Sequence, residues 1–128
     1  MEKIPRARAL TSEGWIDIED KEVACKGIRI FRISCKINHQ EEGRAHLYVL
    51  KNDLHKEPFG FIEDVFVNED FRGQGIGESL IRRAIKIAAE YHCYKVIATS
   101  REERGEVHKL YKRLGFEKYG VEFRMNLK

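Results

Sequence analysis

A glycine-rich link of six residues joins a predicted strand to a predicted helix: Arg72, Gly73, Gln74, Gly75, Ile76 and Gly77. The first N–H groups of a helix have no partner within the helix, and the positive end of its dipole attracts negative charge. Glycine also lets a ligand come close to the backbone. We therefore predict that this link, residues 72–77, here called the glycine loop, binds a phosphate group.

The spacing of the glycines excludes two common phosphate-binding motifs. Gly73, Gly75 and Gly77 are separated by one residue each, whereas the dinucleotide-binding fingerprint has first one and then two residues between its glycines. The loop also does not end in Gly-Lys-Ser or Gly-Lys-Thr, as a P-loop does. On the motif alone, a strand-to-helix turn that binds no ligand stays open as an alternative.

Hydrophobic spacing predicts the elements that hold the glycine loop. Residues 60–67 are apolar and rich in strand formers. Residues 78–89 place apolar side chains on one helical face, namely Leu80, Ile81, Ala84, Ile85 and Ala88. Residues 93–99 are typical of a short buried strand, so the strand–helix–strand unit predicts a right-handed parallel crossover.

The rest of the chain favours antiparallel strands and one more helix. Further predicted elements are a short strand near Trp15, a long strand over 28–37 with a bulge near Phe31, its hairpin partner over 44–51, a helix over 107–114 that ends at Gly115, and a half-buried strand over 121–127. The predicted fold class is α/β (α+β), a mixed, mostly antiparallel sheet with one parallel crossover and flanking helices.

Length and composition predict one domain over residues 1–128. Lys and Arg number 24 against 21 Asp and Glu, and the signs are interleaved, so we expect no nucleic acid partner. No apolar run reaches membrane-spanning length, and the five histidines lack metal-ligand spacing, so neither a membrane nor a metal is expected. Three unclustered cysteines indicate free thiols and a cytoplasmic location.

Three segments, in order along the chain, resemble the GNAT family of N-acetyltransferases: residues 61–77, 93–99 and 110–116. The segments 62–64, 93–95 and 120–124 are also similar to the glucosamine-6-phosphate N-acetyltransferase branch of that family. The resemblance implies the GNAT fold, with acetyl-CoA as the acyl donor bound at the glycine loop.

The chain departs from that branch in two places. The pair of N-terminal helices on the acceptor side is not found before Ile28, which leaves the amino-sugar substrate open. The asparagine that commonly stands seven positions before the late tyrosine is Arg104 here. The resemblance implies a cofactor contact at Arg104, and the changed residue type leaves that contact open.

Two neighbouring carboxylates, Glu63 and Asp64, could act as the base that an amine needs before it attacks a thioester. They interrupt an apolar strand, where burial would raise a carboxyl pKa toward the range of a base. On a regular strand they would point to opposite faces, so only one would face a ligand unless the strand bulges. The resemblance favours Glu63; a water molecule as the base, or an internal pair with an arginine, stays open.

The resemblance assigns roles to two further sites. The backbone of Val65, Phe66 and Val67 would pair with the pantetheine arm and supply an N–H group for the oxyanion. Tyr111 would give a proton to the leaving thiolate, whereas its helical position alone is typical of a core tyrosine.

The sequence thus favours an acetyl-CoA-dependent N-acetyltransferase that acts on a primary amine by direct attack in a ternary complex. A small amine or an amino sugar phosphate is favoured over a protein amine as acceptor. The alternative from another class is a catalytically silent CoA-binding module. The amphipathic last strand, over 121–127, further predicts a homodimer in which this strand adds to a partner's sheet.

Overall fold

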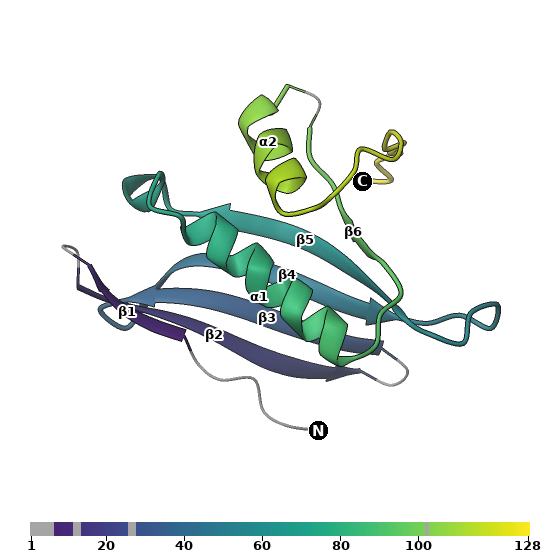
Figure 1. Cartoon of the computed structure of the whole chain (residues 1–128), viewed down its shortest axis with the longest axis horizontal. Coiled ribbons are helices and arrows are strands. Elements are labelled where there is room, and N and C mark those ends of the chain that lie inside the picture. Colours follow the sequence, from purple (N-terminus) through teal and green to yellow (C-terminus); the bar gives the residue numbers. More distant parts are fainter. Residues whose placement is uncertain (1–6, 12–13, 26–27, 102) are drawn as a thin grey trace. The chain divides into compact units, whose positions relative to one another are not determined.

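The computed structural model describes residues 7–11, 14–25, 28–101 and 103–128 (Figure 1). Its elements are, in chain order, β1 (Ala7–Thr11), β2 (Gly14–Cys25), β3 (Ile28–Ile37), β4 (Gln40–Leu50), β5 (Phe59–Val67), the short 3₁₀ helix η1 (Glu69–Phe71), α1 (Ile76–Glu90), β6 (Val96–Ala98) and α2 (Gly105–Arg113). The chain forms two compact units, residues 1–98 and residues 99–128, which are described separately. The single domain over 1–128 therefore stays a prediction.

The six described strands of the first unit form one sheet in sequence order, β1-β2-β3-β4-β5-β6 (Figure 1). The neighbours from β1 to β5 are antiparallel, and β5 pairs with β6 in parallel. Because α1 connects β5 to β6, it forms the crossover that two parallel neighbours require. The predicted mixed sheet with one parallel crossover is confirmed. The described residues before Ile28 form strands and no helix.

The bulge predicted near Phe31 is wrong. β3 pairs in continuous register with β2 and β4 through Phe31, and its register shift against β4 lies between Cys35 and Lys36. The break in hydrophobic alternation arises instead because Arg29 occupies a position on the same face as Phe31. Its side chain stays partly exposed, donates a hydrogen bond of 2.6 Å to Glu22, and places its guanidinium carbon 4.9 Å from the ring centroid of Tyr91.

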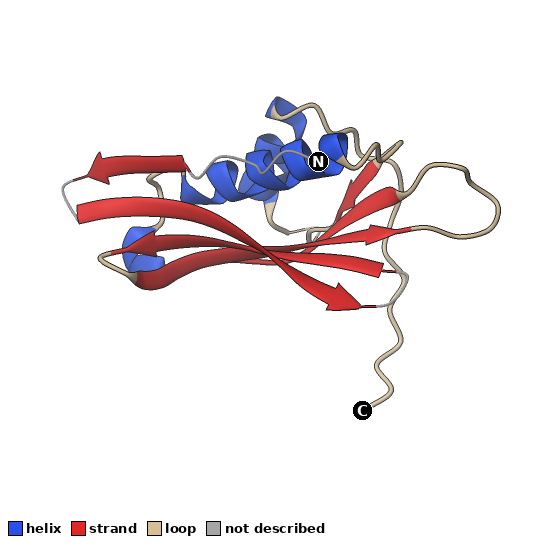
Figure 2. Ribbon diagram, turned by 90° about the horizontal axis from the view of Figure 1, so that it is seen from below, coloured by secondary structure: helices blue, strands red, loops and turns tan. Residues whose placement is uncertain are grey.

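One face of the sheet packs against α1 (Figure 2). The fully buried side chains of this layer are mostly branched aliphatic residues, namely Ile33, Leu47, Ile62, Leu80, Ile81 and Ile87. Four of the five helical positions predicted to face the core are buried, and the fifth, Ile85, is half-buried. Burial of this apolar surface holds α1, and with it the glycine loop, against the sheet.

Arg83 is a charged residue within the buried face of α1. Its side chain is 8% exposed, and its Nη1 donates a hydrogen bond of 2.9 Å to Oδ1 of Asp20 on β2. The pair ties the helix to the part of the sheet before β3. Removing one partner of a buried pair is costly because it leaves an uncompensated charge.

We expect Asp20→Asn to lower the free energy of unfolding by about 2 kcal/mol, between the values for exposed and for buried pairs. We expect an intermediate loss of stability because the Asp20 side chain is 21% exposed, so its pair with Arg83 is only partly buried. Chemical denaturation measures the effect, and Asp53→Asn in the exposed loop after β4 is the control. Equal stability of the two variants would contradict a stabilising role for the Arg83–Asp20 pair.

The second unit contains α2 and a C-terminal segment without regular structure. Gly115 follows α2 with φ +101° and ends the helix as predicted. The half-buried strand predicted over 121–127 is wrong, because no residue after α2 is in a strand. Its apolar side chains are exposed by 68 to 92%, namely Val121, Phe123, Met125 and Leu127. Alternation alone does not form a strand, since the backbone also needs a neighbour for its hydrogen bonds.

The described residues contain neither a helix long and apolar enough to cross a membrane nor a group of three His, Cys, Asp or Glu side chains that could hold a metal ion.

Candidate active site

The glycine loop leads directly into the N-terminus of α1, as predicted. Gly73 and Gly75 have φ of +82° and +81°, the left-handed region that favours glycine, and Gly75 is the N-cap. No side chain caps this end of the helix. A Cβ built on either glycine would meet no neighbouring atom within 4 Å, so the space beside the loop is open. The N–H groups of the first helical turn are therefore accessible to an anion.

Two sets of contacts hold the glycine loop at the end of β5. The Nε of Arg72 donates to the carbonyl of Val67 at 2.9 Å. Asn68 accepts a hydrogen bond of 3.2 Å from the N–H of Asp70, and its Nδ2 donates to Oε2 of Glu42 at 2.7 Å. The N–H of Asn68 also donates to the Glu42 carbonyl at 2.7 Å. Because Glu42 lies in β4, the segment that enters the loop is anchored to a second strand.

β5 bulges at the two predicted carboxylates. In the register with β4, Asp64 and Val65 together oppose the single residue Ala45. Asp64 has φ +54°, a left-handed conformation that aspartate adopts more readily than most residues. The bulge removes the strict alternation that would send Glu63 and Asp64 to opposite faces. Both side chains are exposed, so the burial expected for them is wrong.

The same part of β5 has an edge without a neighbouring strand among the described elements. Pairing with β6 runs from Gly60 to Ile62, and β6 ends at Ala98. β5 continues to Val67, so the backbone of Val65, Phe66 and Val67 extends beyond that pairing. Such an edge can form hydrogen bonds with an extended ligand, as in strand addition.

Two residues of β4 that the sequence reasoning did not single out lie beside Glu63. The Tyr48 hydroxyl donates to Oε1 of Glu63 at 3.4 Å. Burial raises the pKa of Tyr48, and the negative charge of Glu63 raises it further. His46 stands opposite Glu63 in the register, and its Nδ1 is buried without a hydrogen-bond partner among the described residues. The alternation of residues 44–51 indicated that His46 and Tyr48 share a face, but only the register shows that Glu63 is their neighbour.

Tyr111 and Arg104 lie together in the second unit. The Tyr111 hydroxyl donates to the carbonyl of Thr99 at 3.4 Å, and its ring centroid lies 5.3 Å from that of Phe116. Burial raises the pKa of Tyr111, while the charge of Arg104 acts in the opposite direction. The phenol therefore keeps its proton at neutral pH and can donate it. The structure thus groups Glu63 to Gly77 within the first unit, and Arg104 with Tyr111 within the second.

Comparison with known families decides the classification of the chain. The model of the Acetyltransferase (GNAT) family matches residues 26–116, which include β5, the glycine loop and Tyr111. The chain belongs to the GNAT acetyltransferase family. The family resemblance expected from the sequence is confirmed.

The names of individual relatives of this GNAT chain point to different acceptors. A glucosamine 6-phosphate N-acetyltransferase of Trypanosoma brucei brucei is 38% identical over 68 residues, which cover 53% of this chain and 44% of the relative. The N-alpha-acetyltransferase 30 of Homo sapiens is 36% identical over 70 residues, which cover 53% of this chain and 19% of the relative. The chain thus spans less than half the length of these curated relatives.

A solved structure supports the GNAT fold over most of the chain. A putative acetyltransferase from Agrobacterium tumefaciens superposes with a TM-score of 0.69 and 31% identity, covering 78% of this chain and 69% of that protein. The predicted fold class is therefore confirmed by a structural neighbour as well as by the strand order.

Proposed function

We propose that this GNAT protein transfers an acetyl group from acetyl-CoA to a primary amine. The proposal depends on one observation, the uncapped N-terminus of α1 next to the unpaired edge of β5. The helix terminus offers N–H groups to the pyrophosphate, and residues 65–67 offer extended backbone to the pantetheine arm. The open space at Gly73 and Gly75 supports the fit. Acetyl-CoA supplies the activated acetyl thioester.

In the proposed reaction, each group of this chain moves or stabilises one charge. The acceptor ammonium gives a proton to Glu63 or to water, and the free amine attacks the acetyl carbonyl carbon. A backbone N–H of residues 65–67 donates to the oxyanion that develops on the carbonyl oxygen. As the carbon–sulfur bond breaks, Tyr111 protonates the sulfur, and the nitrogen, which became positively charged when it attacked, loses its extra proton to solvent to leave the neutral amide. Tyr111 later regains a proton from solvent, and protonated Glu63 releases its proton to solvent. Direct attack requires both substrates to be bound together, the acetyl thioester along residues 65–67 and the amine beside Glu63.

Glu63 is the carboxylate that we propose as the base, because the family resemblance favours it; the hydrogen bond from the Tyr48 hydroxyl would help to orient it. We expect Glu63→Gln to lower kcat/KM by about tenfold at neutral pH, less than a buried base would, because water can replace an exposed carboxylate in part. Measuring kcat/KM of Glu63→Gln and of Asp64→Asn under the same conditions shows which carboxylate acts as the base. Glu57→Gln in the exposed loop before β5 is the control. A larger loss in Asp64→Asn would move the role to Asp64.

The proposed activity can be tested by following CoA thiol release and acetylated product by mass spectrometry. The protein would be incubated with acetyl-CoA and a panel of glucosamine 6-phosphate, simple primary amines and peptide N-termini. Acetylation of any primary amine above the uncatalysed rate supports the proposal. CoA binding without acetylation across the panel would favour the alternative, a silent CoA-binding module.

The acceptor that we propose is a small amine or an amino sugar phosphate. The glucosamine 6-phosphate enzymes among the relatives support this choice, and the N-alpha-acetyltransferases make a peptide N-terminus the competing acceptor. The described N-terminal strands stand where the amino-sugar branch would place helices, so we expect the acceptor site to differ from that of the branch on this side. The panel separates the two classes by their relative kcat/KM.

A homodimer through residues 121–127 stays a proposal, although these residues are not a strand in the structure. The exposed, alternating apolar side chains of Phe123 and Met125 are suited to pairing with the sheet edge of a second copy. We expect light scattering to give twice the chain mass of 15.0 kDa, and Phe123→Glu to reduce the dimer fraction. A monomeric mass for the unaltered protein at micromolar concentration would contradict the dimer.

A further inference from the structure

The sheet face opposite α1 presents charged side chains near the proposed reaction site. Ala45 and Leu47 of β4 are fully buried on the α1 side, so the alternating residues Arg44, His46 and Tyr48 lie on the opposite face. In the described part of residues 1–98, α1 is the only α-helix. This second face, here called the open face, is therefore where an acceptor can approach Glu63.

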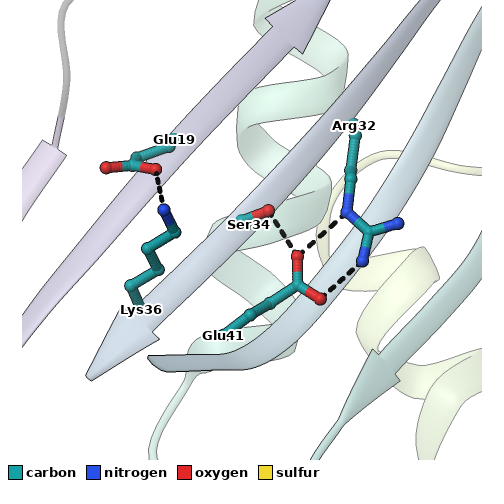
Figure 3. A network of polar contacts seen from close by, with 5 residues as sticks. All are labelled: Glu19, Arg32, Ser34, Lys36 and Glu41. Atoms are coloured by element: carbon teal, nitrogen blue, oxygen red, sulfur yellow. Dashed lines mark hydrogen bonds and ion pairs between the residues drawn. The ribbon is translucent and has the colours of Figure 1, made fainter. Parts of the chain in front are cut away.

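Most of the charges on the open face neutralise one another (Figure 3). Arg32 binds Glu41 through two hydrogen bonds of 3.0 and 2.6 Å, and the Ser34 hydroxyl donates to the same carboxylate at 2.6 Å. Lys36 pairs with Glu19 at 3.0 Å. Burial acts to raise the pKa of Glu41, but these hydrogen bonds outweigh burial and hold the pKa below its usual value. Because Arg32 and Lys36 are already paired with carboxylates, neither is well placed to bind an anionic ligand.

Arg44 differs from these cations because it forms no ion pair with a described carboxylate, although its charge also contributes to the lowered pKa of Glu41. Its guanidinium carbon instead lies 4.8 Å from the ring centroid of Phe66, its partner in the β4–β5 register. The Phe66 side chain is itself 43% exposed. Stacking on a ring restrains the planar guanidinium and leaves its in-plane N–H groups free to form the paired hydrogen bonds that carboxylates and phosphates accept.

The position of Arg44 relates it to the reacting amine. His46 pairs with Glu63, and Arg44 is two residues from His46 on the same face. Arg44 and Glu63 therefore lie on the same face of adjacent strands, on either side of the bulge in β5. A negative group held by Arg44 and an amine held at Glu63 would fit one small molecule.

We propose that Arg44 is a specificity-determining residue that binds an anionic group, a carboxylate or a phosphate, on the acceptor amine. The inference rests on the proposed acetyl transfer and names its substrate class: primary amines with a negative group several ångströms from the nitrogen. The phosphates of acetyl-CoA are a different anion. They belong to the N-terminus of α1, which packs on the other face of the sheet.

The test compares acceptors that differ only in the negative group. Glucosamine 6-phosphate is paired with glucosamine, and 6-aminohexanoate with its amide, so the two pairs distinguish phosphate from carboxylate recognition. Affinity is measured by calorimetry on the CoA complex, and kcat/KM is measured with acetyl-CoA. For at least one pair we expect the unaltered protein to prefer the anionic member by about 30-fold, the effect of a charged hydrogen bond. Arg44→Gln should bring that ratio close to one, and Arg44→Lys should give an intermediate ratio.

The matched control is Lys21→Gln, because Lys21 is an exposed cation on the open face that lies on β2, two strands from Arg44. It should keep the preference of the unaltered protein. An unchanged ratio in Arg44→Gln, or no anionic preference in either pair, would overturn the inference even if both amines were acetylated. Weaker CoA binding in Arg44→Gln with an intact acceptor preference would overturn it as well. A calorimetric preference that depends on Arg44, without any turnover, would support the inference and count against the proposed activity alone.

Discussion

Replacing Tyr111 with phenylalanine is expected to lower kcat by about 10²-fold, the low end for general acid catalysis. CoA thiolate leaves poorly near neutral pH unless a proton reaches its sulfur, and the phenol is the group that we propose to supply it. Burial raises the pKa of Tyr111, so the phenol stays protonated across the neutral range and beyond. Phenylalanine keeps the ring beside Phe116 and removes only the proton and the hydrogen bond to Thr99. That hydrogen bond is 3.4 Å long, so its loss should change the melting temperature little.

Steady-state kinetics at saturating acetyl-CoA measures the effect, and Tyr119→Phe is the matched control. Tyr119 lies in the same unit and is 98% exposed, so the same chemical change there should leave kcat unaltered. The loss in Tyr111→Phe should also shrink with acyl donors whose thiol is more acidic, because such thiols need the proton less. Near-normal kcat for Tyr111→Phe with acetyl-CoA would leave Tyr111 as a packing residue.

Local patterns predicted most of the fold because each element before the C-terminal segment has its partner close in sequence. The hairpin of β3 and β4, the crossover through α1 and the end of α2 at Gly115 all follow from spacing and turn residues. The alternating residues 121–127 show where this reasoning fails. Alternation shows which side chains would share a face, but a strand also needs a neighbouring backbone, and nothing local to residues 121–127 supplies one.

Part of the candidate site could also be predicted from the sequence, and part could not. The glycine loop could be predicted from sequence because its chemistry depends on backbone conformation, which Gly73 and Gly75 reveal by their residue type. The arrangement around Glu63 could not, because it depends on the register of β4 against β5 and on the bulge at Asp64. One extra residue in a strand decides which side chains are neighbours, and no local pattern showed it. Only the pairing of the strands therefore showed which β4 side chains lie near Glu63, namely Arg44, His46 and Tyr48.

Replacing Gly77 with valine is expected to weaken CoA binding by at least about 10²-fold, which corresponds to about 2.7 kcal/mol. Gly77 lies in the first turn of α1, where the N–H groups face the proposed phosphates. Unlike Gly73 and Gly75, it has no positive φ, and a Cβ there would meet only Val67, at an ordinary distance of 3.8 Å. Valine also has a higher helix propensity than glycine, so the substitution should not weaken the helix itself. The substitution should therefore crowd the ligand without straining the protein.

Calorimetry with CoA measures the affinity, and thermal unfolding without ligand shows whether the fold is kept. Gly75→Val is the informative comparison, because its φ of +81° adds backbone strain to the crowding. If the glycine loop binds the pyrophosphate, both variants lose CoA affinity, and only Gly75→Val also loses measurable stability. If strain alone weakened binding, Gly77→Val would bind CoA normally. That result, in a folded protein, would remove the basis for placing the acyl donor at the N-terminus of α1, because the N–H groups there cannot be reached past a side chain that crowds them.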